Sequence, residues 1–264
     1  MWKNIKNDLI FFKSEENSPD IFFTTKSFIN KVINDTFDEE ELKINDDIKI
    51  SEYKIKSLLG LVREINLPKE SFLIFYEQTH SNNVKFVEKD IDLCNKIKVG
   101  NNLYNFKFYP LIDGVITNIK NSIIFVFTAD CIPFFVYDEE ERYIGLIHIG
   151  RRGVEKGIVK NILSLFILKG KNITKKLKFV IGPHICSSCY IVDGKKYSLV
   201  EEIKRNLKEF EIKENQVIIS PYCTSCNNDI FYSYRKDSKT ELRIISAITY
   251  LPIFEYFKSA EVPT

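Results

Sequence analysis

Cys131 and His148 are the residues of this sequence whose types and spacing point most clearly to chemistry. Each lies at the outer end of an apolar run of strand length, and the acidic residues 138–141 between the runs predict an exposed turn. An antiparallel hairpin centred between Glu139 and Glu140 would place Cys131 directly across from His148. Opposed side chains have Cβ atoms ~4.5–5.5 Å apart, so this thiol and imidazole could share one metal ion or one proton.

The two strands that must position this pair are expected at Ile132–Val136 and Tyr143–Ile149, which are rich in β-branched and aromatic residues. The register between them depends on the turn, and Glu-Glu is not the Asn-Gly type of turn that specifies a two-residue loop. A slip of one residue would move Cys131 and His148 to opposite faces of the hairpin.

His80 is a third candidate. It follows an expected strand, Phe72–Phe75, and precedes a run of polar turn residues. A single histidine in such a place is more often a hydrogen-bonded structural residue than a ligand. It becomes a candidate ligand only beside Cys131 and His148.

Arg151 and Arg152 stand between two glycines directly after the second strand, and the spacing of the following apolar residues predicts a helix from about Val154 to Leu168. The first turn of a helix presents free N–H groups and the positive end of the helix dipole. With one guanidinium added, this junction predicts an anion site. The other interpretation is an exposed arginine pair.

Four further cysteines form two Cys-x-x-Cys pairs, Cys186 with Cys189 and Cys223 with Cys226. Such pairs are typical of a four-thiolate zinc site. The 33 residues between the pairs exceed the usual ~15–20 residues of these motifs. The alternative is four thiols that pack as small apolar side chains.

The composition limits the class of protein. A length of 264 residues without repeats or linkers predicts a single domain, residues 1–264, in which residues 90–110 form a loop. The net charge of +2, from 38 basic and 36 acidic residues, gives no basis for binding nucleic acid. No apolar run approaches the ~18 residues that would predict a membrane span. Six cysteines without a secretion signal predict thiols or metal ligands in the cytoplasm. The oligomeric state is left open.

Six short motifs occur in a fixed order along the chain. They are Gln78–His80, Asp113–Thr117, Thr128–Pro133, His148–Gly153, Gly182–Pro183 with Cys189–Tyr190, and Phe231–Asp237. Together they resemble the multicopper polyphenol oxidase-like family, also called the laccase-domain family. The resemblance covers roughly residues 20–252, and six ordered motifs are far more specific than any single one.

The resemblance implies an α+β fold, a single-domain layered sandwich of mixed β-sheets flanked by helices, similar to the catalytic domain of a cytotoxic necrotizing toxin. It implies that His80, Cys131 and His148 are the catalytic residues and bind Zn²⁺. The implied activity is that of a purine nucleoside phosphorylase acting on adenosine, inosine or guanosine with phosphate, with adenosine deaminase and methylthioadenosine phosphorylase side activities. For phosphate, Arg152 is the first choice, with Lys26 and Arg235 behind it.

Two features separate this chain from the family pattern and from its copper-oxidase name. Ile149 and Arg151 replace the alanine and tryptophan that the family usually carries after the histidine, which affects the expected substrate and phosphate contacts but leaves the metal trio intact. A multicopper cluster needs many histidines, and this chain has three.

Two other functions fit the same residues. The first is a metal-free hydrolase of amides or cell-wall precursors, with Cys131 as nucleophile and His148 as base. The second is a non-enzymatic binding module held together by a four-cysteine zinc ion.

Overall fold

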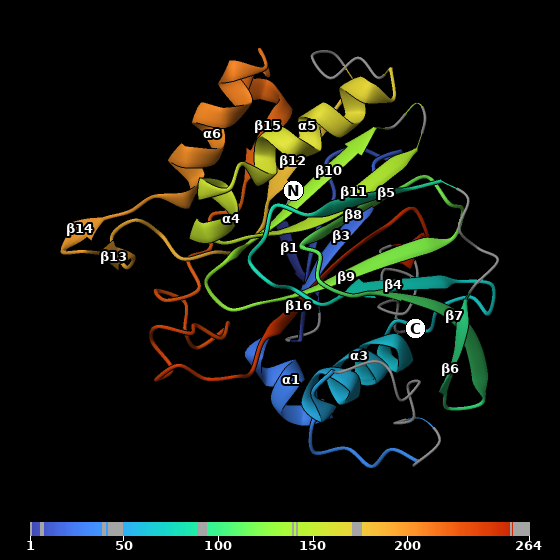
Figure 1. The fold of residues 1–264 in the computed structure, drawn as a ribbon. Coiled ribbons are helices and arrows are strands. Elements are labelled where there is room, and N and C mark those ends of the chain that lie inside the picture. The colour runs from blue at the N-terminus through green and yellow to red at the C-terminus, as the bar shows by residue number, and fades with distance from the viewer. Residues whose placement is uncertain are drawn as a thin grey trace.

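Two large β-sheets pack face to face, and helices cover both outer faces (Figure 1). The computed structural model describes residues 2–5, 8–38, 41, 50–88, 94–138, 140, 142–170, 176–253 and 255. The mixed α+β sandwich expected from the sequence is confirmed.

The first sheet has eight strands and mixed direction. In spatial order they are β1 (Trp2–Ile5), β2 (Leu9–Phe12), β3 (Asp20–Thr24), β16 (Ile244–Thr249), β9 (Ser122–Thr128), β4 (Phe72–Tyr76), β7 (Asn102–Tyr109) and β6 (Asn95–Val99). Strand β4 runs parallel to both of its neighbours, β9 and β7, and the other pairs are antiparallel.

The second sheet has six strands and carries most of the candidate site. In spatial order they are β15 (Val217–Ile219), β12 (Lys178–Ile181), β10 (Ile132–Asp138), β11 (Tyr143–Ile149), β8 (Gly114–Thr117) and β5 (Val84–Val87). The pairs at its two edges, β15 with β12 and β8 with β5, are parallel. A separate small hairpin consists of β13 (Ile191–Val192) and β14 (Lys195–Lys196).

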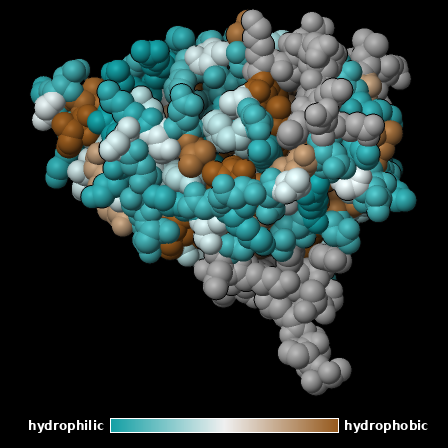
Figure 2. Space-filling view, turned by 90° about the horizontal axis from the view of Figure 1, so that it is seen from below, coloured by the Kyte–Doolittle hydropathy of each residue, from teal (hydrophilic) through white to brown (hydrophobic). Residues whose placement is uncertain are grey.

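The helices form two outer layers. Helices α1 (Lys26–Val32) and α3 (Glu52–Glu64) lie on the eight-stranded sheet, and α4 (Arg151–Glu155), α5 (Ile158–Leu168) and α6 (Leu199–Glu209) lie on the six-stranded sheet, followed by the short helix η1 (Glu214–Gln216) (Figure 1). Seen from the side of α1 and α3, the surface is mostly hydrophilic, with small separate hydrophobic areas (Figure 2). Among the described residues no helix has the length and apolar character needed to cross a membrane.

Strand β10 shows how the layers are held together. Phe135 and Tyr137 point between the two sheets, whereas Phe134 and Val136 pack against the layer of α5 and α6. All four side chains are buried. The strand is therefore apolar on both faces, as expected for a strand covered on both sides.

The predicted register of the β10–β11 hairpin is wrong by two residues. Pro133, not Cys131, lies opposite His148, because β10 continues to Asp138. Asp138 was expected in an exposed turn, but it is 1% exposed, and its carboxylate accepts a hydrogen bond from the backbone N–H of Glu140 (2.9 Å). Since side chains alternate with a period of two, a shift of two residues keeps Cys131 on the face of His148.

The expected helix from Val154 to Leu168 is two helices. Helix α4 begins earlier, at Arg151, and has five residues, and Gly157 separates it from α5. Gly157 has a φ of +82°, a left-handed conformation that ends a helix and that glycine adopts at little cost. The anion site expected at this junction therefore rests on a very short helix, in which few peptide dipoles add.

Residues 90–110 were expected to form a loop, and this is also wrong. Strands β6 and β7 form an antiparallel hairpin across this segment, with a turn at Gly100, whose φ is +57°. Lysine and asparagine on the exposed face alternate with buried residues such as Tyr104 and Phe106, and this polar content concealed an edge hairpin. Residues 90–93 of the expected loop lie outside the described residues.

Candidate functional site

The structure brings His80, Cys131 and His148 together. One ligand atom from each, an imidazole nitrogen or the Sγ atom, lies within 4.8 Å of the other two. The Sγ of Cys131 lies 3.8 Å from Nε2 of His80, and the two imidazole rings meet edge to face with centroids 4.7 Å apart. Two imidazoles and a thiol that converge from three segments form a donor set suited to zinc.

Cys131 is presented by a strained turn between β9 and β10. The preceding residue, Asp130, has a φ of +85°, and its surroundings hold it in that conformation. Its carboxylate accepts hydrogen bonds from the hydroxyl of Thr224 and the backbone N–H of Arg235, each at 2.8 Å. Its carbonyl oxygen accepts one from the N–H of Ile185 (3.0 Å). Three distant segments therefore fix the direction of the thiol.

Asp113, at the entrance to β8, organises both histidines. Its fully buried carboxylate accepts a hydrogen bond from Nδ1 of His148 (2.7 Å) and one from the backbone N–H of His80 (3.0 Å). Ser81 donates to the same carboxylate through its N–H (2.6 Å) and its hydroxyl (2.7 Å). A carboxylate behind a histidine fixes the tautomer, so that Nδ1 carries the proton and Nε2 of His148 is left for a metal ion.

The loop that carries His80 is tied to the helix layer. His80 has a φ of +55°, so the chain reverses sharply at this residue. Two residues later, the side chain of Asn82 donates to the carbonyl oxygen of Lys156 (2.9 Å), and Asn161 of α5 donates to that of Asn82 (2.7 Å). The break between α4 and α5 therefore supplies an anchor for this loop.

The electrostatics of the trio favour a charged thiolate. Burial raises the pKa of the Cys131 thiol, but the charges and hydrogen bonds of His148 and His80 outweigh burial and lower this pKa from 9.0 to about 6. Burial lowers the pKa of His148, but the thiolate of Cys131 and the carboxylate of Asp113 raise it to about 9. Without a metal ion, the pair is thus a thiolate facing an imidazolium.

Gly150 leaves the space that the trio needs. A Cβ atom at this position would lie 2.8 Å from Cδ2 of His80 and 3.0 Å from Sγ of Cys131. Real Cβ atoms essentially never approach other atoms more closely than 3.0 Å. A residue with a Cβ would therefore displace at least one of these two ligands, and the donor set fits a small metal ion bound by three protein ligands.

The three cations expected to bind phosphate lie in different surroundings. Nζ of Lys26 donates to the carboxylate of Asp237 (2.9 Å) and lies over the ring of Tyr232, so much of its charge is already paired. Arg152 is exposed at the start of α4. Arg235 helps to hold the Cys131 turn, because its backbone N–H donates to the carboxylate of Asp130 (2.8 Å).

Tyr190 lies between Arg235 and the trio. The guanidinium of Arg235 lies over its ring, 4.4 Å from the centroid, and donates to the carbonyl oxygen of Ile191 (2.9 Å). Burial raises the pKa of Tyr190, the charge of Cys131 raises it further, and Arg235 and Arg151 lower it. Both arginines and the thiol thus act on one half-buried tyrosine beside the site.

Two residues of this site had no role in the sequence analysis. Asp113 and Tyr190 were each noted only as part of one of the six ordered motifs. A carboxylate directly before a predicted buried strand was the signal available for Asp113. For Tyr190 no local signal existed, because its neighbours come from other parts of the chain.

Comparison with known proteins identifies relatives over most of the chain. The sequence model of the family described as multi-copper polyphenol oxidoreductase laccase matches residues 51–203 and 195–250. The chain is 28% identical over 200 residues to the purine nucleoside phosphorylase YlmD of Bacillus subtilis, covering 66% of this chain and 69% of the relative. It is 31% identical over 194 residues to a purine nucleoside phosphorylase of Rickettsia prowazekii, covering 72% of each.

Solved structures share the fold. The hypothetical protein YfiH of Bacillus licheniformis aligns with a TM-score of 0.70 at 21% identity, over 94% of this chain and 98% of that chain. YlmD from Geobacillus stearothermophilus aligns with the same TM-score at 18% identity and the same coverage. At these identities the likeness shows the fold alone.

Proposed function

This chain belongs to the multi-copper polyphenol oxidoreductase laccase family, and we propose that it acts as a zinc-dependent purine nucleoside phosphorylase. It would convert adenosine, inosine or guanosine and phosphate into the free base and ribose 1-phosphate. The observation that carries the proposal is the convergence of His80, Cys131 and His148 on one point, with Gly150 leaving room beside the first two. The names of the relatives from Bacillus subtilis and Rickettsia prowazekii support the reaction class.

The neighbours of the three proposed ligands indicate a different role for each ligand. Zinc bound by three protein ligands supplies a Lewis acid with one open position. Asp113 holds His148 in one tautomer, and Asp130 holds the turn before Cys131. His80 is the most exposed of the three, so it borders the side from which substrate enters.

In phosphorolysis an oxygen of hydrogen phosphate bonds to C1′ of the ribose while the bond from C1′ to the purine nitrogen breaks. The purine leaves with the bonding electron pair and takes up the proton that phosphate loses. The chain must therefore hold an anion beside the trio, and Arg235, Arg152 and Lys26 are the proposed contacts. We place Arg235 first, because its segment contacts Asp130 directly, whereas Lys26 is paired with Asp237.

The multicopper chemistry in the family's description finds no support in the residues of this chain. It has three histidines in total. His184 is bonded through Nδ1 to the carbonyl oxygen of Gly182 (2.8 Å) and lies outside the trio. Two histidines and one cysteine can hold one ion, not a cluster of several coppers.

The proposal is tested by incubating the metal-loaded protein with adenosine, inosine or guanosine, with and without phosphate. Products are separated by chromatography. We expect free base and ribose 1-phosphate that depend on phosphate and that are lost in Cys131→Ser. Absence of both products from folded, metal-loaded protein would overturn the proposal and leave the cysteine hydrolase and the non-enzymatic binding module. Inosine formed from adenosine would establish the deaminase side activity, and methylthioribose 1-phosphate formed from methylthioadenosine would establish the methylthioadenosine phosphorylase side activity. Both side activities are predictions from the sequence, and so is the cytoplasmic location.

A second candidate function rests on one specific arrangement. Cys131, His148 and Asp113 stand in the order nucleophile, base and orienting carboxylate, and the pKa of Cys131 is lowered to about 6. This arrangement also suits a cysteine hydrolase of amides. A protein that purifies without zinc, and whose amidase activity is abolished by alkylation of Cys131, would favour this function over phosphorolysis.

A further inference from the structure

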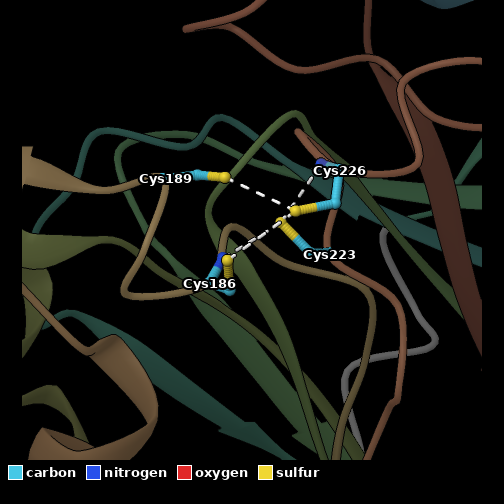
Figure 3. A group of neighbouring side chains, drawn as sticks. All are labelled: Cys186, Cys189, Cys223 and Cys226. Carbon is cyan, nitrogen blue, oxygen red and sulfur yellow. Dashed lines mark hydrogen bonds between the residues drawn. The ribbon is translucent and has the colours of Figure 1, made fainter.

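Four cysteines outside the trio meet in a second cluster, formed by Cys186, Cys189, Cys223 and Cys226 (Figure 3). Their Sγ atoms all lie within 4.8 Å of one another. The separation is 3.5 Å between Cys189 and Cys226 and 4.0 Å between Cys186 and Cys226. All four are free thiols.

These separations match the geometry of a tetrahedral metal site. With zinc–sulfur bonds of ~2.3 Å, the edges of a tetrahedron of four sulfurs are about 3.8 Å long. The observed 3.5 and 4.0 Å lie on either side of this value. A disulfide bond, by contrast, needs sulfurs ~2.05 Å apart. The side chains all point to one centre, as Figure 3 shows.

The fold explains why two pairs so far apart in sequence meet. Strands β12 and β15 are parallel neighbours, with Ile181 opposite Ile219, so their carboxyl ends leave the sheet at one edge. One Cys-x-x-Cys turn follows each strand, and α6 forms the connection between them. The two turns are joined by a bridge between His184 and Cys223. The long spacing is therefore the length of a crossover connection, not evidence against a shared site.

Backbone N–H groups from both turns point at the sulfur of Cys223. Sγ of Cys223 accepts hydrogen bonds from the backbone N–H of Cys186 (3.3 Å) and of Cys226 (3.4 Å). These two bonds tie both Cys-x-x-Cys turns to one sulfur, and this observation is independent of the sulfur–sulfur separations.

We propose that Cys186, Cys189, Cys223 and Cys226 bind a second zinc ion, closed by four thiolates and structural in role. It differs from the open His80–Cys131–His148 site in that all four positions are taken by protein. Its two turns adjoin Ile185 and Thr224, which both donate hydrogen bonds to Asp130. The ion would thus clamp together the two loops that support the turn before Cys131.

Zinc content of protein purified under reducing conditions from zinc-supplemented cells tests the proposal. The comparison is between Cys131→Ser and the double variant Cys131→Ser/Cys189→Ser, with Cys131→Ser/Cys94→Ser as the matched control, because Cys94 belongs to neither cluster. We expect one zinc ion per chain fewer in the Cys189 variant and no change in the Cys94 control. This difference is the same whether or not the first site binds zinc, so failure of the proposed function would be seen separately.

A second measurement uses the wild-type chain, in case the variant does not fold. With cobalt(II) in place of zinc, we expect the absorption bands of tetrahedral cobalt bound to four thiolates. In native zinc-loaded protein, the thiols of this second cluster should also react slowly with a thiol reagent and quickly after a zinc chelator is added, as followed by peptide mass spectrometry. Equal zinc content in both double variants, iron in place of zinc, or a disulfide between Cys189 and Cys226 in metal-free protein would each overturn the proposal.

Discussion

Nδ1 of His148 lies 2.7 Å from a carboxylate oxygen of Asp113, a residue that is itself fully buried. The same carboxylate accepts a hydrogen bond from the backbone N–H of His80 (3.0 Å). One acidic side chain therefore sets the orientation of two of the three expected metal ligands. Burial raises the pKa of Asp113, but its hydrogen bonds from His148 and Ser81 hold this pKa well below its usual range, so it remains charged.

Asp113→Asn should weaken zinc binding at the first site. The N–H₂ group of the new amide would face the N–H and O–H groups of Ser81 that donate to the carboxylate in the wild type. Nδ1 of His148 would lose its charged partner. Loss of such a partner typically reduces metal affinity ~10–100-fold. Competition with a chromophoric chelator measures the affinity. Asp20→Asn is the matched control, because Asp20 is equally buried but pairs with Lys13, and there we expect stability to fall without a change in zinc affinity.

Gly150→Ala should press a methyl group against the side chains of His80 and Cys131. The backbone of Gly150, with a φ of −101°, is allowed for alanine, so the effect arises from the added methyl group. Overpacking of this kind costs ~1–3 kcal/mol, which corresponds to a loss of roughly 5- to 150-fold in zinc affinity and in phosphorolysis.

Gly170→Ala separates this effect from a general loss of stability. Gly170 has a φ of +70° and nothing within 4 Å of an added Cβ. The strained backbone should lower the free energy of unfolding by ~1–2 kcal/mol, while zinc affinity stays the same. Equal zinc affinity in the Gly150 variant and wild type would contradict the assigned role of Gly150.

Arg235→Gln should raise KM for phosphate more than Arg152→Gln or Lys26→Gln. A hydrogen bond to a charged group contributes ~1.5–3 kcal/mol, so an increase of about tenfold or more is expected for Arg235. Lys26 should show the smallest change, because Asp237 already pairs with it. Steady-state kinetics with varied phosphate give the order, and Arg205→Gln on α6 serves as a remote control. A larger effect from Lys26 than from Arg235 would reverse the proposed ranking.

Alkylation of Cys131 in chelator-stripped protein should have a low pH midpoint. Because the pKa of the thiol is lowered to about 6 from 9.0, the reactive thiolate predominates at neutral pH and is lost only as the pH falls through about 6. In His148→Gln the midpoint should rise toward the ordinary value. The rate of iodoacetamide labelling at Cys131, followed by peptide mass spectrometry, measures both. A midpoint near 9 in the stripped wild-type protein would show that the imidazole does not stabilise the thiolate.

The local pattern of the chain was enough for much of this structure. Apolar runs correctly predicted strands β4 and β11 and most of β10, because these strands are buried along their length. The ordered motifs were enough to name His80, Cys131 and His148. The polar edge hairpin β6–β7 was missed, since partial exposure removes the apolar signal.

The contacts between distant residues of the site could be known only from the tertiary structure, because they depend on strand register and strand order. The position of Cys131 relative to His148 required the true end of β10 at Asp138, and the roles of Asp113 and Gly150 required four segments to meet. The two Cys-x-x-Cys pairs, judged too far apart along the chain, meet because β12 and β15 are parallel neighbours. Sequence patterns report which side of an element is buried, whereas contacts between distant residues follow from how the elements pair, which no local pattern encodes.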